Sequence, residues 1–184
     1  MEDPSGAARM GLRGEGSERG RGRGGMVRLL AFLLAAVCCA GGISEAAEPA
    51  DEVWLKIEKG QHRLVVFRGQ AVWDAFPVAL GSNPGQKQRR GDRRTPEGEF
   101  SVVRIQDSRA WTHDFRDGKG EIPGAYGPWF IRLKTGWDGI GIHGTHDPSS
   151  VGKDVTEGCI RLRNADLQKL RPLVRRGTRV AVLP

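Results

Sequence analysis

Three side chains with the chemistry of an acyl-transfer site lie close together in this sequence. His143 stands 16 positions before Cys159, and Arg161 follows the cysteine by two positions. A thiolate can attack a carbonyl carbon, an imidazole can move the proton, and a guanidinium can hold a carboxylate or a developing oxyanion. Cys159 is also the only cysteine outside an N-terminal apolar segment. This pattern predicts a thiol-dependent acyl-transfer site.

Residues next to these three fit supporting parts of such a site. Gly158 permits a tight turn, which predicts that the amides of Gly158 and Cys159 both face the oxyanion. The hydroxyl of Thr156 is expected to position the cysteine loop. No acidic residue is placed to orient His143, so the candidate partner is a backbone carbonyl, that of Gly144. Because a free thiol has a pKa of about 8.5, we expect His143 to activate Cys159 and speed its alkylation at neutral pH.

Each of these residues also has an ordinary structural interpretation. A free cysteine commonly serves as a small buried hydrophobe, and a histidine at a strand end is commonly a hydrogen-bonded structural residue. Arg161 is also consistent with a surface ion pair to Asp166 or Glu157, and Thr156 with a simple turn. The catalytic interpretation therefore depends on the whole set of residues.

The same region disfavours a metal site and a nucleic-acid surface. His143, His146, Asp147 and Cys159 carry ligand atoms, but their spacing matches no recognised zinc pattern and only one thiolate is available. The basic segment from Arg89 to Arg94 lacks the interleaved aromatic residues of a nucleic-acid groove. We therefore expect no metal, no cofactor and no nucleic-acid partner.

The N-terminus has the layout of an exported protein. Residues 1–25 are rich in glycine and arginine, which predicts a disordered extension or a start codon placed too early. Residues 26–47 combine a basic flank, a short apolar run and small residues, as a secretory signal does. The run is shorter than the roughly 20 apolar residues of a spanning helix. We expect cleavage near residue 47, the alternative being an uncleaved anchor that is the chain's only membrane contact.

The remaining residues, 48–184, have the length of one domain. They carry 23 basic and 17 acidic side chains, a net charge of +6. A basic exported domain suits an anionic polymer such as a cell wall, a membrane surface or nucleic acid, and the charge is equally consistent with a surface that has no specific partner. After signal removal a single cysteine remains, so no intrachain disulfide can form, and a lone thiol in an exported protein is a candidate reactive group.

The pattern of apolar residues predicts a mainly β domain. Short alternating or apolar runs bounded by glycine and polar turns are typical of strands. We expect strands at residues 53–57, 64–67, 71–80, 101–105, 130–133, 139–143 and 179–183. Residues 82–95 and 106–127 are predicted to be polar loops. Asn164 is expected to cap one short helix after the cysteine, with Leu167 and Leu170 on its inner face and Pro172 interrupting it.

The combined motifs resemble the L,D-transpeptidase family with the YkuD-type catalytic domain. The residues that carry the resemblance are His143-Gly-Thr, then Thr156-x-Gly-Cys-Ile-Arg161-Leu, with Thr95-Pro-x-Gly-x-Phe and Tyr126-Gly further upstream. The resemblance covers roughly residues 53–183. One departure is that many members have a second histidine where this chain has Glu157. The implied fold is a β-sandwich with the cysteine at a groove.

The resemblance implies a cell-wall reaction. Cys159 is then the nucleophile, His143 the base, and Arg161 a contact for substrate or oxyanion, with Tyr126 also at the site. The thiolate is expected to attack a tetrapeptide stem of peptidoglycan, release the terminal D-alanine and form a thioester acyl-enzyme. The acceptor is a second stem peptide or a lipoprotein amine. Water as the acceptor gives the alternative, an L,D-carboxypeptidase or endopeptidase in the periplasm or cell envelope.

Overall fold

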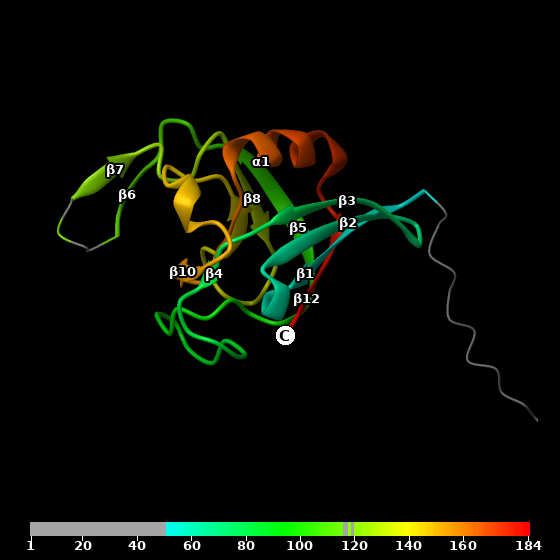
Figure 1. The fold of residues 1–184 in the computed structure, drawn as a ribbon, viewed down its shortest axis with the longest axis horizontal. Helices are drawn as coiled ribbons and strands as arrows, with labels where there is room; N and C mark the ends of the chain where they lie inside the picture. Colours follow the sequence, from blue (N-terminus) through cyan, green and yellow to red (C-terminus); the bar gives the residue numbers. More distant parts are fainter. Residues whose placement is uncertain (1–50, 116–117, 119) are drawn as a thin grey trace, which may run out of the picture. The chain divides into compact units, whose positions relative to one another are not determined.

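The structure is a computed structural model that describes residues 51–115, 118 and 120–184; the predicted extension and signal segment lie outside this range. Its main feature is a mixed sheet of eight strands in the order β11-β9-β8-β5-β12-β1-β2-β3 (Figure 1). The strands of this sheet are β1 Val53–Glu58, β2 Arg63–Arg68, β3 Ala71–Pro77, β5 Gly98–Asp107, β8 Trp129–Leu133, β9 Gly141–His143, β11 Ile160–Arg161 and β12 Arg179–Leu183. Two smaller pairs, β4 Leu80–Gly81 with β10 Asp154–Thr156 and β6 Thr112–Asp114 with β7 Glu121–Pro123, flank it.

The first three strands form the antiparallel meander that the sequence predicts. Leu55 of β1 lies opposite Val66 of β2, and β2 pairs in turn with β3. The last strand, β12, lies parallel to β1, with Leu55 beside Val180. Alternate residues of these strands enter a core that removes large apolar side chains from water. Fully buried core residues include Leu55, Ile57, Leu64, Val66, Ile131, Ile142, Ile160, Leu162, Leu167 and Leu170.

The strand predicted from residue 71 to 80 is two strands, so that prediction is wrong in its extent. β3 ends at Pro77, and the amide of Val78 makes a last hydrogen bond to the meander, to the carbonyl of His62 at 2.8 Å. Beyond it, Ala79 exchanges two backbone hydrogen bonds with Arg161, at 2.8 and 2.9 Å. β4 then pairs with β10. The chain therefore leaves the meander and joins the segment that carries the cysteine.

The loop predicted at residues 106–127 is only partly a loop. β5 extends to Asp107, and β6 and β7 form a hairpin in which His113 lies opposite Ile122. Figure 1 shows this hairpin extending away from the main sheet. Its strands are three residues each and mostly polar, so they lack the apolar alternation that predicts a strand.

One α-helix, α1 Asn164–Leu170, follows the cysteine among the described residues, as predicted. Leu167 and Leu170 are fully buried on its inner face, and Pro172 lies in the 3₁₀ turn that follows. The fold class is therefore confirmed: mainly β, with a curled sheet and one short helix after the cysteine. No helix in the described part of the chain is long and apolar enough to cross a membrane.

The prediction that Asn164 caps the helix is wrong. The residue at the helix N-cap is Arg163, and no side chain caps the helix. Asn164 Oδ1 instead accepts a hydrogen bond of 2.9 Å from the amide of Thr145. The side chain thus ties the start of α1 to the segment that follows β9, where His143 ends the strand.

Candidate active site

Cys159 lies immediately before β11, in a loop that Thr156 holds closed. The hydroxyl of Thr156 donates to the carbonyl of Cys159 at 2.7 Å and accepts from the amide of Gly158 at 3.0 Å. Thr156 is 1% exposed, so water does not compete for these bonds. The hydroxyl fixes the cysteine loop in the way that the sequence predicts.

Gly158 is required by close packing as well as by backbone conformation. Its φ is +126°, and a Cβ there would lie 2.8 Å from the carbonyl oxygen of Arg94. The prediction that the amides of Gly158 and Cys159 both face an oxyanion is wrong for Gly158, because its amide donates to Thr156. The amide of Cys159 is the remaining backbone candidate.

His143 lies next to the cysteine segment because β9 and β11 are parallel neighbours. Arg161 is in register with His143, and Ile160 with Ile142. The carbonyl of Gly144 lies 2.7 Å from Nδ1 of His143, so Nδ1–H donates to it and Nε2 keeps its lone pair in the neutral ring. This is the orienting carbonyl that the sequence analysis named.

Burial keeps His143 neutral. The residue is 2% exposed, and burial together with the charge of Arg161 lowers the pKa of His143 to about 3. The ring also stacks on Phe130, with centroids 5.3 Å apart and planes 10° from parallel. At neutral pH the imidazole is therefore a fixed base with an open lone pair.

Cys159 is a neutral thiol in the resting site. Burial raises the pKa of the Cys159 thiol above its ordinary value, and the nearby charge of Arg161 offsets this only in part. Sγ donates to the carbonyl of Gly139 at 3.3 Å. The expectation of unusually fast alkylation at neutral pH is not supported, since the fraction of thiolate falls as the pKa rises.

Arg161 is a buried cation, and this excludes the surface ion pair considered above. The residue is 6% exposed, and its guanidinium lies over the ring of Phe115, 4.8 Å from the centroid. Its Nε is buried without a hydrogen-bond partner among the residues that the structure describes. Nε of Arg94 and Nε of Arg171 are in the same state, so this atom alone does not mark a site. What sets Arg161 apart is that its buried charge lies in the wall of the cavity that contains Cys159, where a ligand carboxylate or oxyanion could meet it.

Gly144 supports the site by close packing as well as through its carbonyl. A Cβ on Gly144 would lie 2.2 Å from Oδ1 of Asn164 and 3.0 Å from Cα of Gly127. A Cβ on Gly127 would lie 2.3 Å from the same Asn164 oxygen and 2.7 Å from Cα of Gly144. The turn after Tyr126 and the turn after His143 therefore pack backbone against backbone.

Tyr126 joins a hydrogen-bonded chain that the sequence analysis missed. Its hydroxyl lies 2.9 Å from Nδ1 of His113, and Nε2 of His113 lies 3.0 Å from a carboxylate oxygen of Glu157. The Tyr126 ring contacts His143 edge-on, with centroids 5.0 Å apart. Glu157 thus holds a histidine from the β6–β7 hairpin. In the sequence, the only indication of these contacts is the long polar segment that contains the hairpin.

These residues surround one open cavity of about 830 Å³. Its wall includes the three predicted central residues together with Thr156 and Tyr126, whereas Gly144 and Gly158 do not line it. Residues that sequence reasoning did not place there also line it, namely Lys87, Arg90, Arg93, Trp111, His113, Phe115, Phe130, Arg132, Trp137 and Glu157. Within the described ranges, no group of three or more His, Cys, Asp or Glu side chains is arranged to hold a metal ion.

Comparison with known proteins identifies a family for this arrangement. The family profile of the L,D-transpeptidase catalytic domain, YkuD, matches residues 52–182. YkuD of Bacillus licheniformis is 35% identical over 109 residues, which are 59% of this chain and 52% of that protein. YqjB of Bacillus subtilis is 33% identical over 144 residues, 76% of each chain. The match thus spans about half of the Bacillus licheniformis protein.

Solved structures share the fold. An L,D-transpeptidase from Mycobacterium smegmatis superposes with a TM-score of 0.54 at 21% identity, over 72% of this chain and 59% of that one. The L,D-transpeptidase of Enterococcus faecium gives 0.55 at 18% identity, over 72% and 50%. The profile match covers most of the chain and includes every residue of the site described above. The chain therefore belongs to the L,D-transpeptidase family with the YkuD-type catalytic domain.

Proposed function

We propose that this protein is a cysteine-dependent L,D-transpeptidase that acts on peptidoglycan tetrapeptide stems through a thioester acyl-enzyme. The observation that carries the proposal is the shared cavity of Cys159, neutral His143 and a buried Arg161 with an unpartnered Nε. A nucleophile, a base and a fixed cation are the groups that acyl transfer requires.

The first half-reaction begins from a neutral pair. Nε2 of His143 takes the proton from Sγ of Cys159 as sulfur attacks the carbonyl carbon of the donor stem. The C–N bond to the terminal D-alanine then breaks, and the imidazolium returns the proton to the leaving amine. The acyl group remains on sulfur as a thioester. Because His143 is buried, its positive charge exists only briefly during this transfer.

The second half-reaction reverses these proton movements. An acceptor amine attacks the thioester carbon and gives a proton to His143, the C–S bond breaks, and the imidazolium reprotonates sulfur. The acceptor is the amine of a second stem peptide or of a lipoprotein. Water in the same position would give the L,D-carboxypeptidase reaction.

Arg161 is proposed to contact the negative charge nearest to the reacting bond. A guanidinium that is already desolvated loses little hydration on meeting a carboxylate or oxyanion. The cavity volume lies within the about 300–1,000 Å³ of typical ligand sites, so the cavity has room for several residues of a peptide stem.

The reaction is proposed to take place outside the cytoplasm, in the periplasm or cell envelope. The N-terminal segment of residues 26–47 has the layout of a secretory signal, and residues 48–184 carry a net charge of +6. A basic surface favours association with an anionic envelope polymer.

The direct test is incubation of residues 48–184 with disaccharide-tetrapeptide, followed by mass spectrometry of the products. Cross-linked dimer that lacks one D-alanine supports transpeptidation, and tripeptide alone supports hydrolysis. Cys159→Ala is the matched control, because it removes one sulfur atom and should leave the fold intact. Turnover by Cys159→Ala, or no product with either acceptor, would contradict the proposal.

A further inference from the structure

A basic loop, residues 82–97, forms one rim of the catalytic cavity and takes no part in the steps above. It connects β4 to β5. Arg90 and Arg93 line the cavity that contains Cys159, whereas Arg89 lines a separate hollow. All three arginines are exposed. The loop therefore presents two of its three exposed arginines to the site.

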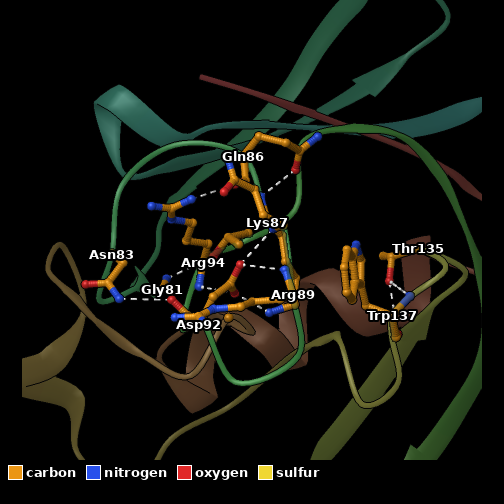
Figure 2. A network of polar contacts seen from close by, with 12 residues as sticks. Gly81, Asn83, Gln86, Lys87, Arg89, Asp92, Arg94, Thr135 and Trp137 are labelled. Carbon is orange, nitrogen blue, oxygen red and sulfur yellow. Dashed lines mark hydrogen bonds and ion pairs between the residues drawn. The ribbon is translucent and has the colours of Figure 1, made fainter.

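The loop is held in shape by a buried carboxylate. Asp92 accepts hydrogen bonds from Nζ of Lys87 at 2.6 Å and from the amides of Gln88, Arg89 and Arg94 at 2.7, 3.1 and 3.1 Å (Figure 2). The side chains of Lys87 and Asp92 are only 4% and 8% exposed. A buried ion pair with this many bonds fixes one backbone conformation. The charges of Lys87 and Asp92 cancel, so the exposed arginines supply the net positive charge that the loop presents.

Arg93 adopts a backbone conformation that is uncommon for its type. Its φ is +56°, in the left-handed region. Its carbonyl oxygen accepts from the amide of Asn83 at 3.2 Å and would lie 2.4 Å from a Cβ on Gly81. Such strain is concentrated at functional sites. Here it places Arg93 in the cavity wall.

The loop is also packed directly on the catalytic segment. The carbonyl of Arg94 contacts Gly158, the residue before the nucleophile. Lys87 lies over the ring of Trp137, 5.4 Å from its centroid, and Trp137 is two residues from Gly139, which accepts from Cys159. The positions of the arginines relative to the thiol are therefore set by packing.

Neither Arg90 nor Arg93 forms an ion pair with another described residue. The acidic side chains in the cavity wall are Asp114, Asp138 and Glu157. Glu157 is bound to His113. Two guanidinium groups on a fixed loop backbone, with no carboxylate partner among the described residues, suit a contact with a carboxylate of the ligand.

We infer that Arg90 and Arg93 form a second carboxylate-binding subsite, separate from Arg161, which recognises an acidic group of the peptide stem remote from the bond that breaks. This inference rests on the proposed function and adds a substrate preference to it. The enzyme should prefer stems with free carboxylates over stems in which the same groups are primary amides.

The test compares a free-acid tetrapeptide stem with two amidated forms, one at the glutamyl carboxylate and one at the diaminopimelyl side-chain carboxylate. For the wild-type protein, kcat/KM should fall about tenfold with one amide, since exposed ion pairs contribute a few-fold each. In the double variant Arg90→Gln with Arg93→Asn, this preference should shrink to about twofold or less. Asparagine is chosen because it tolerates the left-handed backbone of Arg93.

Arg89→Gln is the matched control, because it removes one arginine of the same loop that lies outside the cavity. It should keep the wild-type preference. Thiol alkylation of the double variant by a small neutral reagent, and its melting temperature, report whether the loop has kept its shape.

Failure of the inference and failure of the proposed function give different results. Wild-type turnover of acid and amide stems at equal rates would overturn the inference alone. So would a full acid preference in the double variant, or an equal loss of preference in Arg89→Gln. Absence of turnover of any stem would count against the proposed function.

Discussion

At the scale of single residues, the proposed nucleophile Cys159 and the proposed base His143 are both uncharged in the resting site. Burial lowers the pKa of His143 and raises the pKa of Cys159, so neither proton has moved before the substrate arrives. A preformed thiolate–imidazolium pair would instead require a lowered thiol pKa. In the proposed mechanism the proton transfer therefore accompanies attack on the substrate.

The first prediction concerns the pH dependence of thiol reactivity. The thiolate is the reactive form, and its pKa is raised, so the alkylation rate of Cys159 should keep rising as the pH passes about 8.5. No step should occur near about 6.5, the ordinary pKa of histidine, because His143 stays neutral down to a pKa of about 3. Intact-mass kinetics with a neutral haloacetamide across this range measure the profile. A rate plateau at neutral pH would show that an ion pair forms instead.

The second prediction separates geometry from charge at Arg161. A planar guanidinium can hold a carboxylate through two parallel hydrogen bonds, and a lysine ammonium cannot. Charge-assisted bonds contribute about 1.5–3 kcal/mol each, so Arg161→Lys should lower kcat/KM at least about tenfold while the protein stays folded. Alkylation of Cys159 by a small neutral reagent should change much less. Equal activity of Arg161→Lys and the wild type would remove Arg161 from the substrate contacts.

At the scale of elements, the site is made by two neighbouring parallel strands and the short segments around them. β9 carries His143, β11 carries Arg161, and the loop before β11 carries Cys159. β3 stops at Pro77, which frees Ala79 to bond with the backbone of Arg161. The break between β3 and β4 therefore connects the meander to the segment that carries Cys159 and Arg161.

The third prediction tests how the cysteine loop is held. Thr156→Val keeps the size of the side chain but removes both hydroxyl hydrogen bonds and leaves the amide of Gly158 without its acceptor. We expect a loss of about 2 kcal/mol in the free energy of unfolding. Turnover should fall at least about tenfold, since small displacements of reacting groups are costly.

Thr156→Ser is the control for this change, because it keeps the hydroxyl and removes only a methyl group. Its stability and turnover should lie much closer to those of the wild type. Urea unfolding and steady-state kinetics of the two variants measure both effects. A valine variant as active as the serine variant would show that the hydroxyl does not position Cys159.

At the scale of the whole molecule, the described part of the chain contains a complete core. The buried residues run from Leu55 to Val182, and the first and last strands, β1 and β12, are paired with each other. Such pairing joins the two ends of the described domain, so we expect it to fold without an added segment.

The fourth prediction follows from this core. A chain that starts at Glu48 should be soluble and fold cooperatively, with the same turnover as the full-length chain, because the core formed by the described residues lies entirely beyond this point. Circular dichroism, thermal unfolding and the stem-peptide assay compare the two forms. An insoluble or inactive truncation beside an active full-length chain would show that the N-terminal segment takes part in the fold.

The sequence by itself determined the chemical groups and most of the strands. Cys159, His143 and Arg161 are recognised by type and spacing, and runs such as residues 53–57 and 179–183 show the apolar pattern of buried strands. Residue type, spacing and apolar pattern are local features, so a short stretch of chain is enough to recognise them. The β6–β7 hairpin was not predicted because its strands are short and polar. Asn164 was predicted to cap the helix, but it accepts a hydrogen bond from Thr145, 19 positions earlier, which the local sequence does not show.

Only the tertiary structure decided how these groups behave. Protonation depends on burial and on charges from other elements, which is why His143 and Cys159 are both neutral where the sequence predicted an activated thiol. The contact between His113 and Glu157 joins residues 44 positions apart. The placement of Arg90 and Arg93 is also a property of the tertiary structure. The sequence shows only that they belong to a basic loop. The buried Lys87–Asp92 ion pair and the packing of the loop on Gly158 place them in the cavity wall.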